Sequence, residues 1–305
     1  MRILFCSDPL NSRSVDVDYE LEMNTANSFG FKVDFVHLED LLDLKVQQAL
    51  RLIEPSHALE TVIYRGWMLS PEHYEKLYQG LLKKNLELIN NPAQYVASHY
   101  FPNSYPIIKD YTPKSRWLEI DAVHQDYNSI YERVAEFHQQ PILIKDYVKS
   151  RKHEWEDACF IPDASDKKQL DFVVKNFIER QGQDLNGGIV FREFISLEKV
   201  AEHPKSGMPL SREYRLMFFK RQLLQVLDYW EEVTYDYEQP NLDIFIQLAS
   251  QFNSNFFSID IGKTVDGRWL IIEVGDGQVS GLPENAVDVE KFYKSLKEDM
   301  YEPSI

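Results

Sequence analysis

The chain has 305 residues, and 49 acidic against 33 basic side chains give it a formal net charge of −16 at pH 7. That charge repels a phosphate backbone and argues against non-specific binding of nucleic acid. No apolar run approaches the roughly 18 residues of a membrane span, and two cysteines are too few for a disulfide framework. We therefore expect a soluble, cytoplasmic protein that binds neither nucleic acid nor membranes, with no oligomeric state specified by the sequence.

Residues 1 to about 100 alternate between strand-like and helix-like segments, which predicts a small parallel α/β layer. One helix should begin near Ser70, because the Pro71 that follows is favoured in a first helical turn. No G-x-G-x-x-G follows the first strand, so a dinucleotide site has no support there. A proline-bearing link at 100–113 separates this layer from a second region, which gives two predicted domains, 1–105 and 106–305.

The second region mixes helices and strands. A helix is expected at about 120–139, and Asp166 should cap another that ends before Gly182. Strands are expected in the segments PILIKDYVKS, GIVFREFISL, REYRLMFF and QLLQVLDYW, followed by a hairpin and a C-terminal helix at about 284–299.

The hairpin carries two acids that should face each other. Asp266 and Gly267 separate its strands and predict a two-residue turn, in which Asp260 lies directly opposite Glu273. The two Cβ atoms would then be roughly 5 Å apart, where like charges repel unless a cation, a basic side chain or a shared proton intervenes. A divalent cation is the simplest remedy, and two ordinary acids on a solvated face are the alternative.

Basic side chains in the middle of the chain indicate an anion. Lys145 interrupts an apolar strand, where an ammonium needs a partner, and the loop that begins at Lys149 is rich in basic residues and suits a polyphosphate. The alternatives are a lysine that reaches water at the strand end and a solvated loop.

Further along, strands carry Arg192 beside Glu193, and Glu213 two residues before Arg215. Two guanidinium groups, a lysine and carboxylates together are typical of a site for a nucleotide and magnesium, although salt bridges within the sheet would also explain them. The glycine-rich loop 275–283 could hold a carboxylate or phosphate with its backbone N–H groups, or it is an ordinary turn.

The order of these motifs carries a resemblance. The segments KDYVKS, FIP, FREFI, EYR, SIDIG and IIEVGDGQVSGLP, with Trp155 between the first two, follow one another over almost the whole chain. In this order they resemble the ATP-grasp superfamily, and in detail its divergent clade named for two arginines and a lysine. The resemblance implies an α/β (α+β) protein with an ATP-grasp fold, in which a Rossmann-like pre-ATP-grasp domain precedes two α+β subdomains that clasp the nucleotide.

The resemblance also implies ATP and Mg²⁺ as ligands and a role for each motif. The two arginines would act in catalysis, the lysines would contact phosphate, the FREFI segment would meet the adenine, and the hairpin acids would ligate magnesium. The residues implied are Arg192 and Arg215 for catalysis; Lys145, Lys149, Glu193, Phe194, Ile195 and Glu213 for the nucleotide, with Glu213 at the ribose; and Asp260 and Glu273 for the metal.

The chain departs from the superfamily pattern in two places. The loop after Lys145 is basic where the superfamily has glycines, and the Glu-x-Asn metal pair is replaced by Glu273 followed by Val274 and Gly275. Asp276 is expected to stand in for the missing asparagine if the strand bulges.

The activity that the resemblance implies is an ATP- and Mg²⁺-dependent ligase. Its substrates would be a carboxylate and an amine or thiol, a peptide or protein among them, joined through an acyl-phosphate. An ATP-binding assembly factor that performs no ligation and a phosphotransferase on the same scaffold are the alternatives, and the sequence does not identify the acid or the acceptor.

Overall fold

A computed structural model describes residues 1–204, 208–233 and 240–301 of the chain. It divides into two compact units: the first contains Met1–Ser98, Val200–Ile261 and Glu273–Ile305, and the second His99–Lys199 and Gly262–Ile272. The predicted boundary at 105/106 lies near the first crossing, but the chain crosses between the units three more times. The N-terminal layer therefore packs in one unit with C-terminal segments, an arrangement that a division into successive domains did not anticipate.

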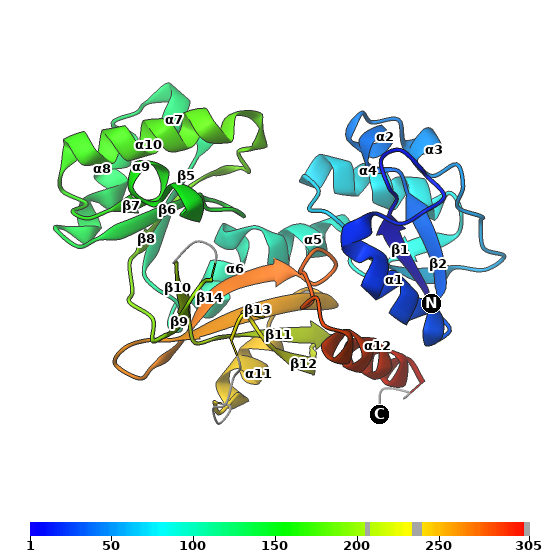
Figure 1. Ribbon diagram of the computed structural model, residues 1–305. Helices are drawn as coiled ribbons and strands as arrows, with labels where there is room; N and C mark the ends of the chain where they lie inside the picture. Colours follow the sequence, from blue (N-terminus) through cyan, green and yellow to red (C-terminus); the bar gives the residue numbers. More distant parts are fainter. Residues whose placement is uncertain (205–207, 234–239, 302–305) are drawn as a thin grey trace. The chain divides into compact units, whose positions relative to one another are not determined.

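The N-terminal part of the first unit is the expected parallel α/β layer (Figure 1). Its strand order is β2-β1-β3-β4. Ser70 accepts a hydrogen bond from the His73 N–H and caps the helix with Pro71 in its first turn, as predicted. The elements are β1 Arg2–Cys6, η1 Val17–Tyr19, α1 Glu20–Ser28, β2 Lys32–Val36, α2 Leu38–Leu42, α3 Val46–Ala49, β3 Glu60–Arg65, α4 Pro71–Leu82, β4 Leu86–Leu88 and α5 Pro92–His99.

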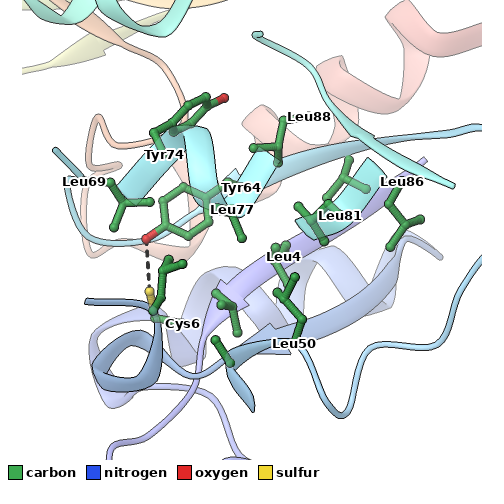
Figure 2. Close-up of a cluster of buried hydrophobic side chains, with 14 of the residues drawn as sticks. Leu4, Cys6, Leu50, Tyr64, Leu69, Tyr74, Leu77, Leu81, Leu86 and Leu88 are labelled. Atoms are coloured by element: carbon green, nitrogen blue, oxygen red, sulfur yellow. Dashed lines mark hydrogen bonds between the residues drawn. The ribbon is translucent and has the colours of Figure 1, made fainter. Parts of the chain in front are cut away.

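One face of this sheet forms a leucine-rich core with the helices α2 to α5 (Figure 2). Cys6 and Tyr64 lie within it, fully buried, and their Sγ and hydroxyl atoms are 3.2 Å apart. Burial raises the pKa of the Cys6 thiol to about 11, and it does the same for the buried Cys159. Both cysteines are free, as expected from their apolar surroundings.

The other face shares its core with a second sheet, whose order is β12-β11-β13-β14. Ile3 and Phe5 of β1 pack in the same cluster as Met217, Phe256 and Phe292. The elements are β9 Lys199–Glu202, β10 Pro209–Ser211, β11 Glu213–Phe219, β12 Gln222–Asp228, α11 Asp243–Ala249, β13 Phe256–Lys263, β14 Trp269–Asp276 and α12 Ala286–Tyr301. Strands β9 and β10 form a separate two-stranded sheet.

The second unit is built on an antiparallel sheet of order β5-β8-β6-β7, with α10 packed on one face. Asp166 caps α10 by accepting from the N–H groups of Lys168 and Gln169, as predicted. The elements are α6 Phe101–Ile108, β5 Ser115–Glu119, α7 Ile120–Gln125, α8 Ser129–Val134, η2 Ala135–Phe137, β6 Ile142–Asp146, η3 Lys152–Glu154, α9 Trp155–Ala158, β7 Phe160–Ile161, α10 Lys167–Gln181, η4 Gly182–Asp184 and β8 Gly188–Glu193.

The prediction of one helix at 120–139 was wrong. The segment holds the two short helices α7 and α8 and a 3-10 turn, because the Asp126 side chain accepts from the Asn128 N–H and ends the first helix. Over the described residues, no helix has both the length and the apolarity needed to cross a membrane.

Candidate functional site

An ion pair links the two central strands of the second sheet of the first unit. The Nε and Nη2 atoms of Arg215 on β11 donate to the two carboxylate oxygens of Asp260 on β13, both at 2.8 Å. Asp260 is 3% exposed and the Arg215 side chain 20%. Although burial disfavours its charge, the Asp260 carboxylate raises the pKa of Arg215. Bidentate geometry makes this a strong pair, so the salt-bridge interpretation holds for Arg215 in this conformation.

The turn of the hairpin differs from the prediction. The Thr264 N–H donates to the Arg268 carbonyl at 2.8 Å and the Gly267 N–H to the Thr264 carbonyl at 2.9 Å, with Gly267 at φ +88°. The turn therefore has three residues, and Gly267 supplies the left-handed conformation that this turn needs. Near the turn, the strands are one residue out of the expected register.

A β-bulge restores the register farther along. The Gly277 N–H donates to the Phe256 carbonyl at 3.0 Å, so β14 holds one more residue between this bond and the turn than β13 does. When residues are counted along both strands from the hydrogen bond between Gly277 and Phe256, Glu273 is the register partner of Asp260. Consistent with this, both carboxylates act electrostatically on Arg215 and on the Tyr229 ring that lies 5.1 Å below its guanidinium.

The two hairpin carboxylates suit a hard divalent cation. Mg²⁺ is usually bound through one or two carboxylates, with phosphate and water oxygens completing an octahedron. No group of three potential ligands from His, Cys, Asp or Glu occurs within the described residues. Asp260 and Glu273 could supply the two carboxylates of a magnesium site of this kind.

Asp276 has a different environment. It is fully buried, with one oxygen accepting from the Asn90 amide at 2.6 Å and the other from the backbone and side-chain N–H groups of Gln278. Burial raises its pKa to about 7, and these amide donors oppose the shift. Both oxygens are engaged with protein donors, so its side chain is placed to fix the loop rather than to bind a cation.

The glycine-rich loop is held by its carbonyl oxygens. Arg65, fully buried and paired with Glu22, donates to the carbonyls of Gly277 and Ser280, and Arg215 donates to that of Gly281. A Cβ at Gly281 would meet no atom within 4 Å. The open space beside it is a cavity of about 130 Å³ lined by Arg215, Leu227, Asp228, Tyr229, Glu231, Gly281, Leu282 and Pro283.

Glu213, at the start of β11, is 4% exposed. One carboxylate oxygen accepts from the Trp230 indole at 3.3 Å, and its backbone carbonyl accepts from the Tyr229 N–H. The carboxylate is therefore contacted by the segment that directly follows β12.

In the second unit, Lys145 lies on the sheet face that α10 leaves uncovered. Ile142 and Ile144 point into the core on the covered face, and strand alternation places Leu143 and Lys145 on the other. Phe160 of β7 is the direct partner of Leu143 and shares that face. The prediction that Lys145 is offered to an anion is compatible with this position.

An aromatic cluster stands on the same face. The Trp155 ring stacks on Phe160 with centroids 5.1 Å apart, and Phe194 meets both rings edge-on at 5.9 and 5.2 Å. Trp155 remains 37% exposed. An aromatic surface next to a lysine suits a nucleobase and its phosphates.

The basic loop after Lys145 is anchored at its base by Asp146. This fully buried carboxylate accepts from the N–H groups of Val148 and Lys149 and from the side chains of Gln181 and Asn186. Farther along the loop, Arg151 and Arg180 share the Glu154 carboxylate. Part of the basic cluster is thus engaged in ion pairs, while the Lys149 side chain is exposed.

The segment 193–195 follows β8. The Glu193 N–H donates to the Lys114 carbonyl and the Phe194 N–H to the Pro141 carbonyl. For the Ile195 N–H, no acceptor is present among the described residues. This is the backbone group that the edge of a purine ring could use.

Arg192 donates to neutral groups in β14 and in the segment before β5. Its Nη1 donates to the Ile272 carbonyl at 2.5 Å, and its Nη2 donates to the Thr112 hydroxyl at 2.8 Å and to the Ile271 carbonyl at 3.0 Å. The guanidinium carbon also lies 5.6 Å from the Phe101 ring centroid. Arg192 is 7% exposed.

The predicted residues thus divide between the units: Glu213, Arg215, Asp260, Glu273 and Asp276 in the first; Lys145, Lys149, Arg192, Glu193, Phe194 and Ile195 in the second. Sequence reasoning missed Trp155 and Phe160 as parts of an aromatic surface, because Trp155 stands among acidic residues and only Phe160 lies in an apolar run. It also missed Tyr229 and Thr112, which no motif distinguishes.

The chain is similar to known proteins in its sequence and in its fold. The sequence matches the family model described as ATP-grasp domain, R2K clade family 3, over residues 134–296. No curated protein matches the sequence.

Among solved structures, a RimK domain ATP-grasp protein from Sphaerobacter thermophilus is similar with a TM-score of 0.56 and 14% identity over 97% of this chain and 99% of that one. The ATP-grasp ligase PsnB, complexed with a minimal precursor, Mg and ADP, gives 0.57 and 11% over 98% of both chains. The macrocyclase MdnC from Microcystis aeruginosa, bound with its precursor peptide MdnA, gives 0.53 and 13% over 98% and 100%. At such low sequence identity, the structural similarity shows a shared fold and nothing more.

Proposed function

Because the chain belongs to the R2K clade of the ATP-grasp domain family, we propose that it is an ATP- and Mg²⁺-dependent ligase that joins a carboxylate to an amine or thiol. The observation that carries the proposal is the pairing of Asp260 with Arg215 on central strands, with Glu273 as the register partner of Asp260. Two carboxylates and a guanidinium can hold a metal and the phosphate oxygens that it bridges.

The proposed reaction has two steps. A carboxylate oxygen of the acid substrate attacks the γ-phosphorus of ATP, the bond from that phosphorus to the bridging oxygen breaks, and ADP leaves. The amine nitrogen or thiol sulfur of the acceptor then attacks the acyl carbon, phosphate leaves, and the acceptor's proton passes to solvent. Both steps depend on positioning and on charge neutralisation more than on a side-chain acid or base.

Each predicted residue then has a role. Lys145 contacts the phosphates, Glu213 the ribose, and the segment 193–195 the adenine edge, with Trp155 and Phe160 beside the base. Magnesium bound by Asp260 and Glu273 would neutralise the phosphate oxygens. Asp276 is left out of the metal set, because its oxygens are bonded to amide donors.

We place the acid or acceptor substrate in the cavity beside Gly281, where Arg215 lines the wall. A peptide is the favoured substrate class, since PsnB and MdnC are both solved with precursor peptides. The small cavity would receive the reacting side chain of such a peptide.

Calorimetry tests the nucleotide part of the proposal. ATP with Mg²⁺ should bind with clear heat, and adding EDTA should weaken the affinity sharply. ADP release that depends on an added amine or thiol would then separate ligation from nucleotide binding alone. The absence of any binding at millimolar ATP would reject the proposal, and ADP release without an acceptor requirement would favour a phosphotransferase.

Replacing Gly281 with valine tests the substrate position. The added side chain meets no protein atom at its Cβ, so the fold should tolerate it, yet it enters the cavity. Turnover should fall while ATP affinity stays nearly unchanged. Equal losses of both, or a lower melting temperature with full activity per folded molecule, would show that the loop is only a turn.

A further inference from the structure

We propose that Arg192 is a positioning residue for Glu273, in place of the phosphate contact that the family resemblance implies. It would hold the β-bulge of β14 in the form that brings Glu273 to Asp260. This role rests on the proposed function, because it assumes that Glu273 binds the metal.

The contacts of Arg192 define a clamp on one strand. Its two terminal nitrogens reach the carbonyls of Ile271 and Ile272, the two residues directly before Glu273. Successive carbonyls of a regular strand point in opposite directions, so two neighbours can meet one guanidinium only where the strand is irregular. The clamp therefore lies at the bulge itself.

A neighbouring segment supports the same strand. The Thr112 hydroxyl donates to the Ile271 carbonyl at 2.8 Å while accepting from Arg192, and the Ile271 N–H donates to the Tyr111 carbonyl at 2.7 Å. Both the N–H and the carbonyl of Ile271 thus form hydrogen bonds with these segments, and none of the bonds named here involves the other strand of the hairpin.

The bulge decides where Glu273 points. Without the extra residue in β14, the register at the turn would carry through the hairpin, and Glu273 would fall opposite Ile259, on the face away from Asp260. Partners that orient a metal ligand typically affect metal affinity by about 10- to 100-fold. Arg192 is such a partner, acting through the backbone.

Two protein variants separate positioning from phosphate binding. Arg192→Met removes both carbonyl contacts, and Arg192→Lys keeps the charge but offers one ammonium for two carbonyls. Two quantities are measured for each variant. One is the affinity for a non-hydrolysable ATP analogue in EDTA. The other is the Mg²⁺ concentration that gives half-maximal thermal stabilisation in the presence of that analogue. Both variants should need about tenfold more Mg²⁺, with metal-free nucleotide affinity within about twofold of wild type.

Thr112→Val is the milder second variant and carries the test if Arg192→Met does not fold. It should raise the Mg²⁺ requirement in the same direction but less, and hydrogen exchange should be faster at the Ile271 amide without any ligand. Arg116→Met is the matched control, because Arg116 lies on the neighbouring strand β5 and pairs with Glu136. It should change none of these quantities.

Three results would overturn the role. One is a loss of nucleotide affinity in Arg192→Met that is equal with and without Mg²⁺ and is partly restored in Arg192→Lys, which indicates a phosphate contact. Another is an unchanged Mg²⁺ requirement and unchanged exchange in Thr112→Val. The third is wild-type protein that binds no nucleotide, which removes the ligase proposal as well, whereas the first two results leave that proposal standing.

Discussion

Arg192 and Arg215 are both largely buried arginines on sheets, yet they differ in what they touch. Arg192 donates to two backbone carbonyls and a hydroxyl, and Arg215 forms a bidentate pair with one carboxylate. Two carbonyls hold the guanidinium of Arg192 to neighbouring positions of one strand, which favours a role in shaping that strand. A carboxylate can exchange its arginine for a metal ion, and the arginine can exchange the carboxylate for phosphate. The pairing with Asp260 therefore marks Arg215 as an arginine that a metal and a nucleotide can displace from its partner.

The largest effect is expected when a carboxylate beside Arg215 is replaced by an amide. Asp260→Asn and Glu273→Gln should each lower turnover by about 100-fold or more. Asp260→Asn should also lose stability, about 2 kcal/mol, because Arg215 is left with a neutral partner. Thermal melts and steady-state rates on both variants check this, and equal stability losses would mean that both acids are structural.

Arg215→Met tests the exchange from the other side. Turnover should fall by about tenfold or more, because a charge-assisted phosphate contact contributes about 1.5–3 kcal/mol. In addition, Mg²⁺ without nucleotide should stabilise this variant more than wild type, since Asp260 and Glu273 repel each other once the guanidinium is gone. A magnesium-induced shift in melting temperature that is equal in both proteins would contradict the exchange.

Lys145 extends the comparison to a cation on an open sheet face. Lys145→Met should weaken ATP binding by about tenfold, because a charge-assisted phosphate contact is lost. Calorimetry measures the affinity, and a melt on the same preparation checks that the variant is folded. Normal ATP affinity would show that the side chain only reaches solvent.

An effect on stability alone concerns Asp276, whose two carboxylate oxygens accept from amide groups. Its pKa is ordinarily 3.8 and about 7 in the fold, so between those values the folded protein keeps a proton that the unfolded chain releases. Stability should therefore fall as pH rises from 4 to 7, by at most about 1.4 kcal/mol per pH unit. Asp276→Asn should lose this slope, although it is less stable throughout because its amide faces the Asn90 donor. Urea unfolding at several pH values compares the two slopes, and equal slopes would contradict the assignment.

Local patterns predicted most of the elements. The parallel layer, the caps at Ser70 and Asp166 and the strands that carry the site follow from alternation and from cap residues, which act within a few positions. The break in the helix at 120–139 was missed because a short Asp-x-Asn turn overrode the helical pattern.

The opposed pair of Asp260 and Glu273 was predicted by an argument with two compensating errors. The turn has three residues rather than two, and the bulge in β14 shifts the register back. That bulge is fixed by Arg192 and Thr112, which are 80 and 159 positions from the Ile272 and Ile271 carbonyls that they hold. No pattern within the hairpin encodes contacts so distant in sequence. The partners of Arg192, and hence its difference from Arg215, could only come from the structure.

The shared core of the first unit has a consequence for biosynthesis. Ile3 and Phe5 are made about 250 to 290 residues before Phe256 and Phe292, with which they share a core. At the usual rates of translation the first strand waits roughly 15 to 60 s for these partners. During that time one face of a nascent sheet is apolar and uncovered, which is the kind of surface that chaperones bind and that aggregates when they are scarce. Protein yield in cells should therefore depend on chaperone supply more than the stability of the finished fold would suggest.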